Sequence, residues 1–246
     1  MKRLLIALFL CLFAFKASAW NPMIVTSGGG ATGEAGCIAG TTFSWNSEHS
    51  VDTDTACDSA GSPLAGTLVD ATIVDDYVLV TAVNDYLQWT IDSTEFNGSL
   101  GTVWLSFYLI DGDTDTDVEA GTIFEIYGDV ANEIFCYVAT ATDTVACTHR
   151  GTATNLSVGG GNETLVHNTW YRLGYAWNVS TGAQSVTAEV LGQAAAWDDD
   201  ADAIDNMAVQ PTLVTIGEQN SANAMADHVR TKDFVICNTY KCTDPL

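Results

Sequence analysis

The sequence predicts an all-β protein built as a two-sheet antiparallel β-sandwich. Short runs with apolar and polar residues in strict alternation recur along the chain, as half-buried strands require. Turn-rich stretches of Gly, Asn, Asp and Ser separate these runs. Only Gly192–Met207 could form a short helix, and a loop fits its Asp198–Asp200 run equally well. With 246 residues, of which 47% are hydrophobic, the chain can bury one substantial core.

The first element is a secretory signal peptide over residues 1–19. Lys2 and Arg3 precede the apolar run Leu4–Phe15, and Ala17-Ser-Ala19 is typical of a cleavage site. The alternative is a transmembrane anchor, but twelve apolar residues span about 18 Å as a helix, whereas a bilayer core needs about 30 Å. The sequence therefore predicts an exported protein that starts at Trp20, extracellular or, in a bacterium, periplasmic, with no transmembrane anchor.

The remainder is interpreted as one domain, with residues 20–69 as a lead-in with the first strands and residues 70–246 as the main sandwich. Gly28–Gly30 is expected to be flexible. In the run from Trp170, alternation places Tyr171, Leu173, Tyr175 and Trp177 on one face. The other expected strands, in chain order, are Val78–Val83, Leu87–Ile91, Thr102–Ile110, Thr122–Tyr127, Ser185–Val190, Leu213–Gly217 and Asp233–Cys237.

Six cysteines remain after the signal peptide, and an even number in an exported chain suggests disulfides. A hairpin turn at Ala141-Thr142 would place Cys136 opposite Cys147, close enough for a bridge. The pairs Cys237–Cys242 and Cys37–Cys57 then follow by elimination. A metal site is the alternative, although the chain has no Cys-x-x-Cys motif.

Several segments, taken in order, resemble the laminin-G-like jelly rolls of the concanavalin A-like lectin/glucanase superfamily. Asn84-Asp-Tyr-Leu-Gln-Trp89 is similar to the family's N-D-Y strand, and Gly121-Thr-Ile-Phe-Glu-Ile-Tyr127 to its G-T-I-F-S-I strand. The resemblance covers roughly Asp70 to Tyr240. The other matching segments are Gly101–Tyr108, Thr169–Trp177, Val186–Gly192, Thr215–Gly217 and Lys232–Ile236.

The resemblance implies two packed antiparallel sheets, a glycan-binding role and a bound calcium ion. In such jelly rolls an aspartate of the closing strand often ligates the calcium, and this role is carried over to Asp233. The alternative is an ion pair between Asp233 and Lys232 or Arg230. The acidic run Asp111–Asp117 lacks the glycine and glutamate of an EF-hand and is interpreted as a solvated turn.

No catalytic residue is predicted. The hydrolases of the superfamily carry paired acids on one strand, in a pattern like E-x-D-x-x-E, whereas here Glu125 is followed by Ile126 and Tyr127. Glu125 is therefore expected to be a solvated strand residue. No nucleophile elbow, zinc-protease motif or recognisable triad occurs, so an enzymatic function rests on fold analogy alone.

Glycan binding needs exposed aromatic rings beside polar groups, because the C–H face of a sugar packs on a ring while its hydroxyls take hydrogen bonds. Trp104 and Tyr108 alternate with Val103, Leu105 and Phe107. If the latter form the core, Trp104 and Tyr108 line the outer surface, and both are predicted ligand-binding residues. Asn-x-Ser/Thr sequons, latent outside a eukaryotic secretory route, begin at Asn97, Asn155, Asn162 and Asn178.

The charge balance excludes nucleic acid as a partner. After residue 19 there are five scattered basic residues against 31 acidic ones, so no basic stripe is available for phosphates. Two functional classes remain. The first is a secreted carbohydrate-binding or adhesion module whose partner is a glycan or a glycosylated surface. The second is an extracellular coat, matrix or appendage subunit, and a glycan hydrolase or lyase is a third, weaker class.

Overall fold

The computed structural model describes the chain from residue 37 onward, with gaps. Contacts divide the chain into two units, Met1–Thr32 and Gly33–Leu246, and everything below concerns the second. The signal peptide and Gly28–Gly30 lie outside the described residues. The described ranges are 37–46, 54–74, 76–80, 85–109, 121–139, 144–151, 155–159, 165–166, 168–179, 186–191, 198–200, 204–217 and 229–246.

Among the described residues, ten strands form the first sheet, sheet A, and every pairing in it is antiparallel. Its order is β15-β14-β13-β8-β17-β1-β2-β3, and β6, which carries β5, also pairs with β17. The strands are β1 (Phe43–Trp45), β2 (Ala56–Cys57), β3 (Pro63–Leu64), β5 (Thr72–Val74), β6 (Tyr77–Val80), β8 (Leu100–Leu109), β13 (Trp170–Asn178), β14 (Val186–Leu191), β15 (Asp198–Asp200) and β17 (Val229–Cys237).

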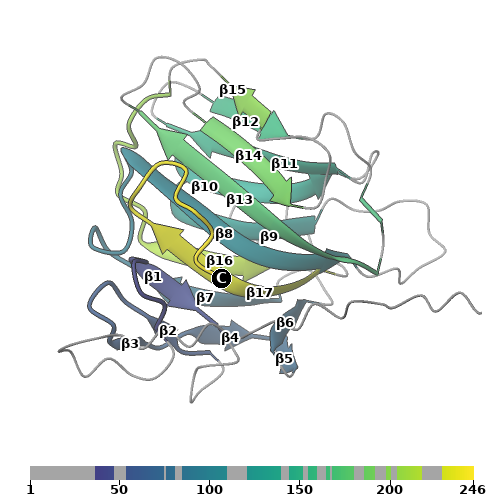
Figure 1. Ribbon diagram of the computed structural model, residues 1–246. Helices are drawn as coiled ribbons and strands as arrows, with labels where there is room; N and C mark the ends of the chain where they lie inside the picture. Colours follow the sequence, from purple (N-terminus) through teal and green to yellow (C-terminus); the bar gives the residue numbers. More distant parts are fainter. Residues whose placement is uncertain are drawn as a thin grey trace, which may run out of the picture. The chain divides into compact units, whose positions relative to one another are not determined.

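The described part of the chain forms a second sheet, sheet B, of seven strands in the order β12-β11-β10-β9-β16-β7-β4, again with antiparallel pairs. The two sheets lie one behind the other as layers in Figure 1. The strands of sheet B are β4 (Thr67–Val69), β7 (Tyr86–Thr90), β9 (Gly121–Asp129), β10 (Asn132–Ala139), β11 (Thr144–Arg150), β12 (Asn155–Gly159) and β16 (Leu213–Gly217).

The core lies between the sheets and is rich in aromatic rings. Phe234 of sheet A makes an edge-to-face contact with Phe124 of sheet B, with ring centroids 5.4 Å apart. The alternation predicted from Trp170 holds, since the four residues expected on one face all belong to the core, together with Val103, Leu105 and Phe107. The predicted all-β, two-sheet antiparallel sandwich is therefore confirmed, because alternation lets each sheet bury one face against the other.

Of the two alternatives for Gly192–Met207, a short helix or a loop, the described part of the segment shows no helix. Asp198–Asp200 forms the short strand β15, which pairs with β14, and residues 204–207 are not helical. The backbone pairing at a free sheet edge outweighs the weak helical pattern of this segment. Among the described residues, no helix has the length and apolarity needed to cross a membrane.

The predicted hairpin and the three disulfides are present. In the β10–β11 pair Cys136 faces Cys147 and Val138 faces Val145, as the turn at Ala141-Thr142 requires. Bridges join Cys136 to Cys147, Cys37 to Cys57 and Cys237 to Cys242. Disulfides are typical of proteins that fold in an oxidising compartment.

Candidate functional site

The outer face of sheet A carries a row of aromatic and basic side chains across four neighbouring strands. Arg230 of β17 lies opposite Tyr108 of β8, and Tyr108 lies opposite Trp170 of β13. On the other side of β17, Arg230 pairs with Leu79 of β6, which places Tyr77 diagonally beside it. These side chains share one face because residues in register on adjacent strands point the same way.

The rings and the cations of this row are in contact. The Trp170 ring lies 5.3 Å from the Tyr108 ring and 6.0 Å from the Tyr77 ring, measured between centroids. The Arg230 guanidinium carbon lies 4.8 Å from the Tyr108 ring and 4.9 Å from the Tyr77 ring. The Lys232 ammonium lies 4.8 Å from the Trp170 ring. We call Tyr77, Tyr108, Trp170, Arg230 and Lys232 the Trp170 patch.

Polar groups surround the patch. The Tyr108 hydroxyl donates a hydrogen bond to the Asn168 side chain (3.2 Å), and Lys232 forms an ion pair with Asp76. Trp170 is 37% exposed, and the other four members of the patch are half-buried. The rings are thus held by neighbours while part of their surface remains open to solvent.

Trp170 itself was not predicted as a site residue. The alternation of its strand does place Trp170 on the face away from the core residues Tyr171 and Leu173, and this pattern could have indicated an exposed ring. The sequence pattern could not predict that Tyr77, Trp170 and Arg230 lie together, because their contacts depend on which distant strands pair.

The other predicted aromatic residue, Trp104, is not open to solvent. It does lie on the outer face of sheet A, but only 3% of its surface is exposed. Its indole N–H donates to the carbonyl oxygen of Cys242 (3.0 Å), and the Arg172 guanidinium lies 6.0 Å from its ring. The C-terminal segment, residues 238–246, therefore covers Trp104. The expectation that Trp104 lines the open surface was wrong, because alternation gives the face of a strand and not what lies over it.

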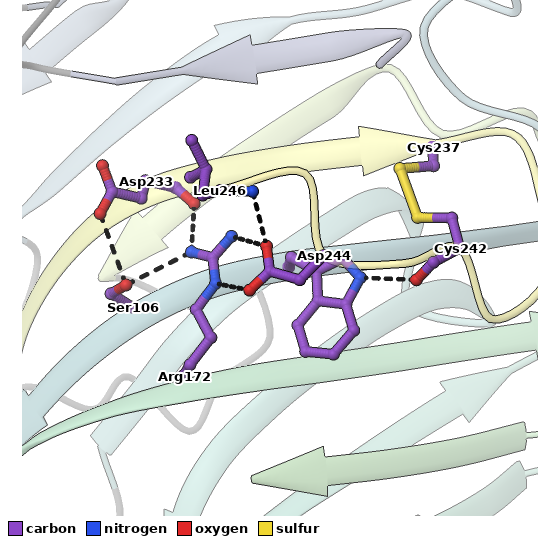
Figure 2. A network of polar contacts seen from close by, with 8 residues as sticks. Ser106, Arg172, Asp233, Cys237, Cys242, Asp244 and Leu246 are labelled. Carbon is purple, nitrogen blue, oxygen red and sulfur yellow. Dashed lines mark hydrogen bonds and ion pairs between the residues drawn. A yellow bond between two sulfur atoms is a disulfide. The ribbon is translucent and has the colours of Figure 1, made fainter. Parts of the chain in front are cut away.

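An ion pair holds the C-terminal segment on the sheet. Arg172 of β13 donates from Nε and Nη2 to the two carboxylate oxygens of Asp244, over 2.9 and 2.7 Å. Figure 2 shows this bidentate contact beside the Cys237–Cys242 disulfide. Arg172 Nη1 also donates to the Asp233 carbonyl oxygen (2.8 Å) and to Ser106 Oγ (3.3 Å). A planar guanidinium suits such a fixed, multiple contact.

Loss of Asp244 is expected to loosen this segment and to expose Trp104. In Asp244→Ala, Arg172 loses both carboxylate bonds, and the free energy of unfolding should fall by about 1–3 kcal/mol. Trp104 should become accessible to a fluorescence quencher such as acrylamide. Thr243→Ala, at an exposed neighbouring position, is the control. Equal quenching in Asp244→Ala and wild type would contradict the role of the ion pair.

Asp233 lies at an irregularity in β17, where the register with β8 shifts between Lys232 and Val235. Its backbone has a positive φ of 56°, and its carboxylate accepts a long hydrogen bond from Ser106 Oγ (3.5 Å). The guanidinium of Arg172 binds the carbonyl of the same residue. This guanidinium occupies one carbonyl oxygen next to the Asp233 carboxylate, and calcium ligation by Asp233 stays a prediction. The described residues also include no group of three or more His, Cys, Asp or Glu that could hold a metal.

The outer face of sheet B carries a buried acidic pair. Glu125 of β9 and Glu133 of β10 are both 0% exposed, although Glu125 was expected to be solvated. That expectation was wrong, because alternation gives the face of a strand and not how exposed a side chain on that face is. Arg150 of β11 forms an ion pair with Glu133 and lies over the Phe135 ring. Burial raises the pKa of Glu133, against the opposing effects of its hydrogen bond with Glu125 and of Arg150.

His149 lies next to Arg150 on β11, opposite Ile134, and is completely buried. Neither of its ring nitrogens has a hydrogen-bond partner among the described residues. Burial alone lowers the pKa of His149 to about 3, so the imidazole is neutral at physiological pH. An inaccessible, neutral histidine cannot reach a ligand, and it acts on stability instead.

Other predicted features remain outside the described part or make structural contacts. The run Asp111–Asp117 and Asn162 lie outside the described residues, as does the side chain of Asn155. Asn97 Oδ1 accepts a hydrogen bond from the Ser99 amide over 2.9 Å, within its own turn.

The amino-acid sequence matches no protein-family model and no curated protein. Solved structures share the fold. The receptor binding domain of botulinum neurotoxin D aligns with a TM-score of 0.62 and 10% identity, covering 82% of this chain and 50% of that one. The botulinum neurotoxin serotype C1 binding domain aligns at 0.59 and 11%, covering 84% and 50%. Trypanosoma rangeli sialidase aligns at 0.59 and 10%, covering 84% and 31%.

The chain thus spans about half the length of the toxin-domain chains and a third of the sialidase chain. At 10–11% identity, the similarity shows a shared arrangement of strands and says nothing about the residues of a binding site. The comparisons show that the chain has the β-sandwich fold that these binding domains and this sialidase contain.

Proposed function

We propose that the protein is a secreted glycan-binding module that binds its ligand at the Trp170 patch. The observation that carries the proposal is a partly exposed tryptophan, packed beside two tyrosines and bordered by hydrogen-bonding and charged side chains. Tyr108, which the sequence analysis had predicted to bind ligand, belongs to this patch.

The chemistry of the patch suits a sugar. The apolar C–H face of a pyranose packs on an aromatic ring, and its hydroxyls need hydrogen-bond partners at the ring edge. The Trp170 ring offers the face, while Asn168, Asp76 and Lys232 offer donors and acceptors around it. Because neighbouring rings already hold Trp170, little side-chain entropy is lost on binding.

Two further observations support the proposal. Structures with the same fold include receptor binding domains of botulinum neurotoxins and a sialidase in complex with 2,3-difluoro-KDN. The signal-peptide pattern of residues 1–19 and the three disulfides favour an exported protein.

Substitution of Trp170 is expected to abolish most of the binding. In Trp170→Ala the stacking face disappears, and affinity on a broad glycan array should fall by roughly tenfold or more. Tyr137→Ala is the matched control, because Tyr137 is a partly buried, stacked aromatic residue in sheet B. Loss of binding in Tyr137→Ala, with Trp170→Ala unaffected, would move the site to sheet B.

The same array separates the competing functions. A blank array with the chain from Trp20 onward, together with self-association in sedimentation, would replace the proposal by a coat, matrix or appendage subunit. Release of reducing ends or unsaturated products would indicate a hydrolase or lyase. A second array in EDTA tests calcium: loss of binding in the chelator would support an ion held by Asp233, and binding that survives would remove calcium from the proposal.

A further inference from the structure

Basic residues are scarce in this protein, and most of those described are neutralised by a carboxylate. Arg150 pairs with Glu133, Arg172 with Asp244, and Lys232 with Asp76. Within the described ranges, Arg230 has no ion pair and no hydrogen bond, although acidic residues outnumber basic ones by 31 to 8 in the chain. A guanidinium that no described carboxylate neutralises, in so acidic a chain, has a charge to offer a ligand.

The position of Arg230 also favours a role in binding a ligand. Its guanidinium lies against the rings of Tyr77 and Tyr108, and the side chain is half-buried. Its Nε atom is buried and has no hydrogen-bond partner among the described residues. A partly desolvated guanidinium interacts more strongly with an anion than one in bulk water, and its flat fork matches carboxylate and sulfate oxygens.

We propose that Arg230 binds an anionic group, a carboxylate or a sulfate ester, of the glycan that stacks on Trp170. This inference rests on the proposed function and names the class of ligand. Lys232 is the other cation of the patch, but Asp76 neutralises it. Arg230 therefore supplies the charge, and the two tyrosines hold its guanidinium in place by cation–π contact.

The spacing within the patch fits a short saccharide. Arg230 and Trp170 lie on β17 and β13, with β8 between them, so their backbones are about 10 Å apart across the sheet. One sugar ring can stack on Trp170 while an acidic group on it, or on the next ring, reaches Arg230 over the Tyr108 ring. A free anion would be attracted by the charge of Arg230 but would have no sugar ring to stack on Trp170.

The test compares ligands that differ only in charge. Biolayer interferometry measures binding to 3′-sulfolactose and lactose, and to polygalacturonate and its methyl ester. The wild type should bind the anionic member of a pair roughly tenfold more tightly than the neutral one. Arg230→Gln should remove this preference by weakening the binding of the anionic member far more than that of the neutral one, while Arg230→Lys should retain part of the preference. Circular dichroism verifies that each variant folds. If Arg230→Gln does not fold, the comparison of wild type with Arg230→Lys provides the test.

The outcomes separate this inference from the proposed function. Equal binding of both members by the wild type, still sensitive to Trp170→Ala, would overturn the anionic ligand and leave the glycan site intact. A charge preference that persists in Arg230→Gln would also overturn the role of Arg230. Failure to bind any glycan would overturn both proposals. Binding of inorganic sulfate as tightly as 3′-sulfolactose would reduce the site to an anion site without a sugar.

Discussion

Acidification from pH 7 to pH 4.5 is expected to destabilise the protein by roughly 2–3 kcal/mol through His149 alone. Burial lowers the pKa of His149 from 6.5 to about 3. Between these values the unfolded chain binds a proton that the folded protein excludes. The stability contributed by the neutral imidazole is therefore complete above pH 6.5 and falls by about 1.4 kcal/mol for each pH unit below it, until about pH 3.

Urea denaturation at a series of pH values measures this effect. His149→Leu replaces the imidazole by an apolar group in an apolar environment, so its stability should fall less steeply than that of the wild type between pH 6.5 and 4. Asp129→Asn is the control, because hydrogen bonds from Asn132 and Ala131 lower the pKa of Asp129 below 3.8 and confine its effect to more acidic solutions. Parallel profiles for wild type and His149→Leu would refute the assignment.

Removal of Arg150 is expected to cost about 3 kcal/mol at pH 7. The change Arg150→Met keeps most of the packing over Phe135 but leaves the Glu133 carboxylate buried without its cation. Proton uptake by Glu133 limits the loss, because burial already raises its pKa and the loss of Arg150 raises it further.

The pH dependence of this variant identifies the cause. A group whose pKa is raised on folding is most favourable when protonated, so the deficit of Arg150→Met should shrink as the pH falls towards the ordinary glutamate value of 4.5. The double variant Arg150→Met/Glu133→Gln should recover much of the loss at pH 7, since it removes the buried charge. A deficit that is independent of pH would attribute the effect to packing instead.

Local pattern was sufficient to predict the long strands of both sheets and their inner faces, but not short edge strands such as β12 and β15. The alternation from Tyr171 to Trp177 and the run Leu213–Gly217 were both reproduced, because a half-buried strand must alternate to bury one face. The Cys136–Cys147 pair was predictable as well, since a hairpin of known turn position fixes its own register.

The candidate site was only partly predictable, because it depends on contacts between distant segments. Trp104 and Tyr108 have the same pattern in sequence, but the C-terminal segment covers only Trp104. Arg230 meets Tyr77 and Tyr108 because β17 pairs with both β6 and β8, and nothing in the local sequence specifies that pairing. Glu125 is likewise buried although the alternation of its strand places it on the outer face of sheet B.

The place of β17 in sheet A determines when the protein can fold during synthesis. This strand, residues 229–237, lies between β8 and β1, and a hydrogen bond joins Thr42 to Ile236 across a separation of 194 residues. Sheet A therefore cannot be completed until residues up to Cys237 have left the ribosome, and contacts of such long range form slowly. The disulfides span only 20, 11 and 5 residues, so their short loops can close before the two sheets assemble.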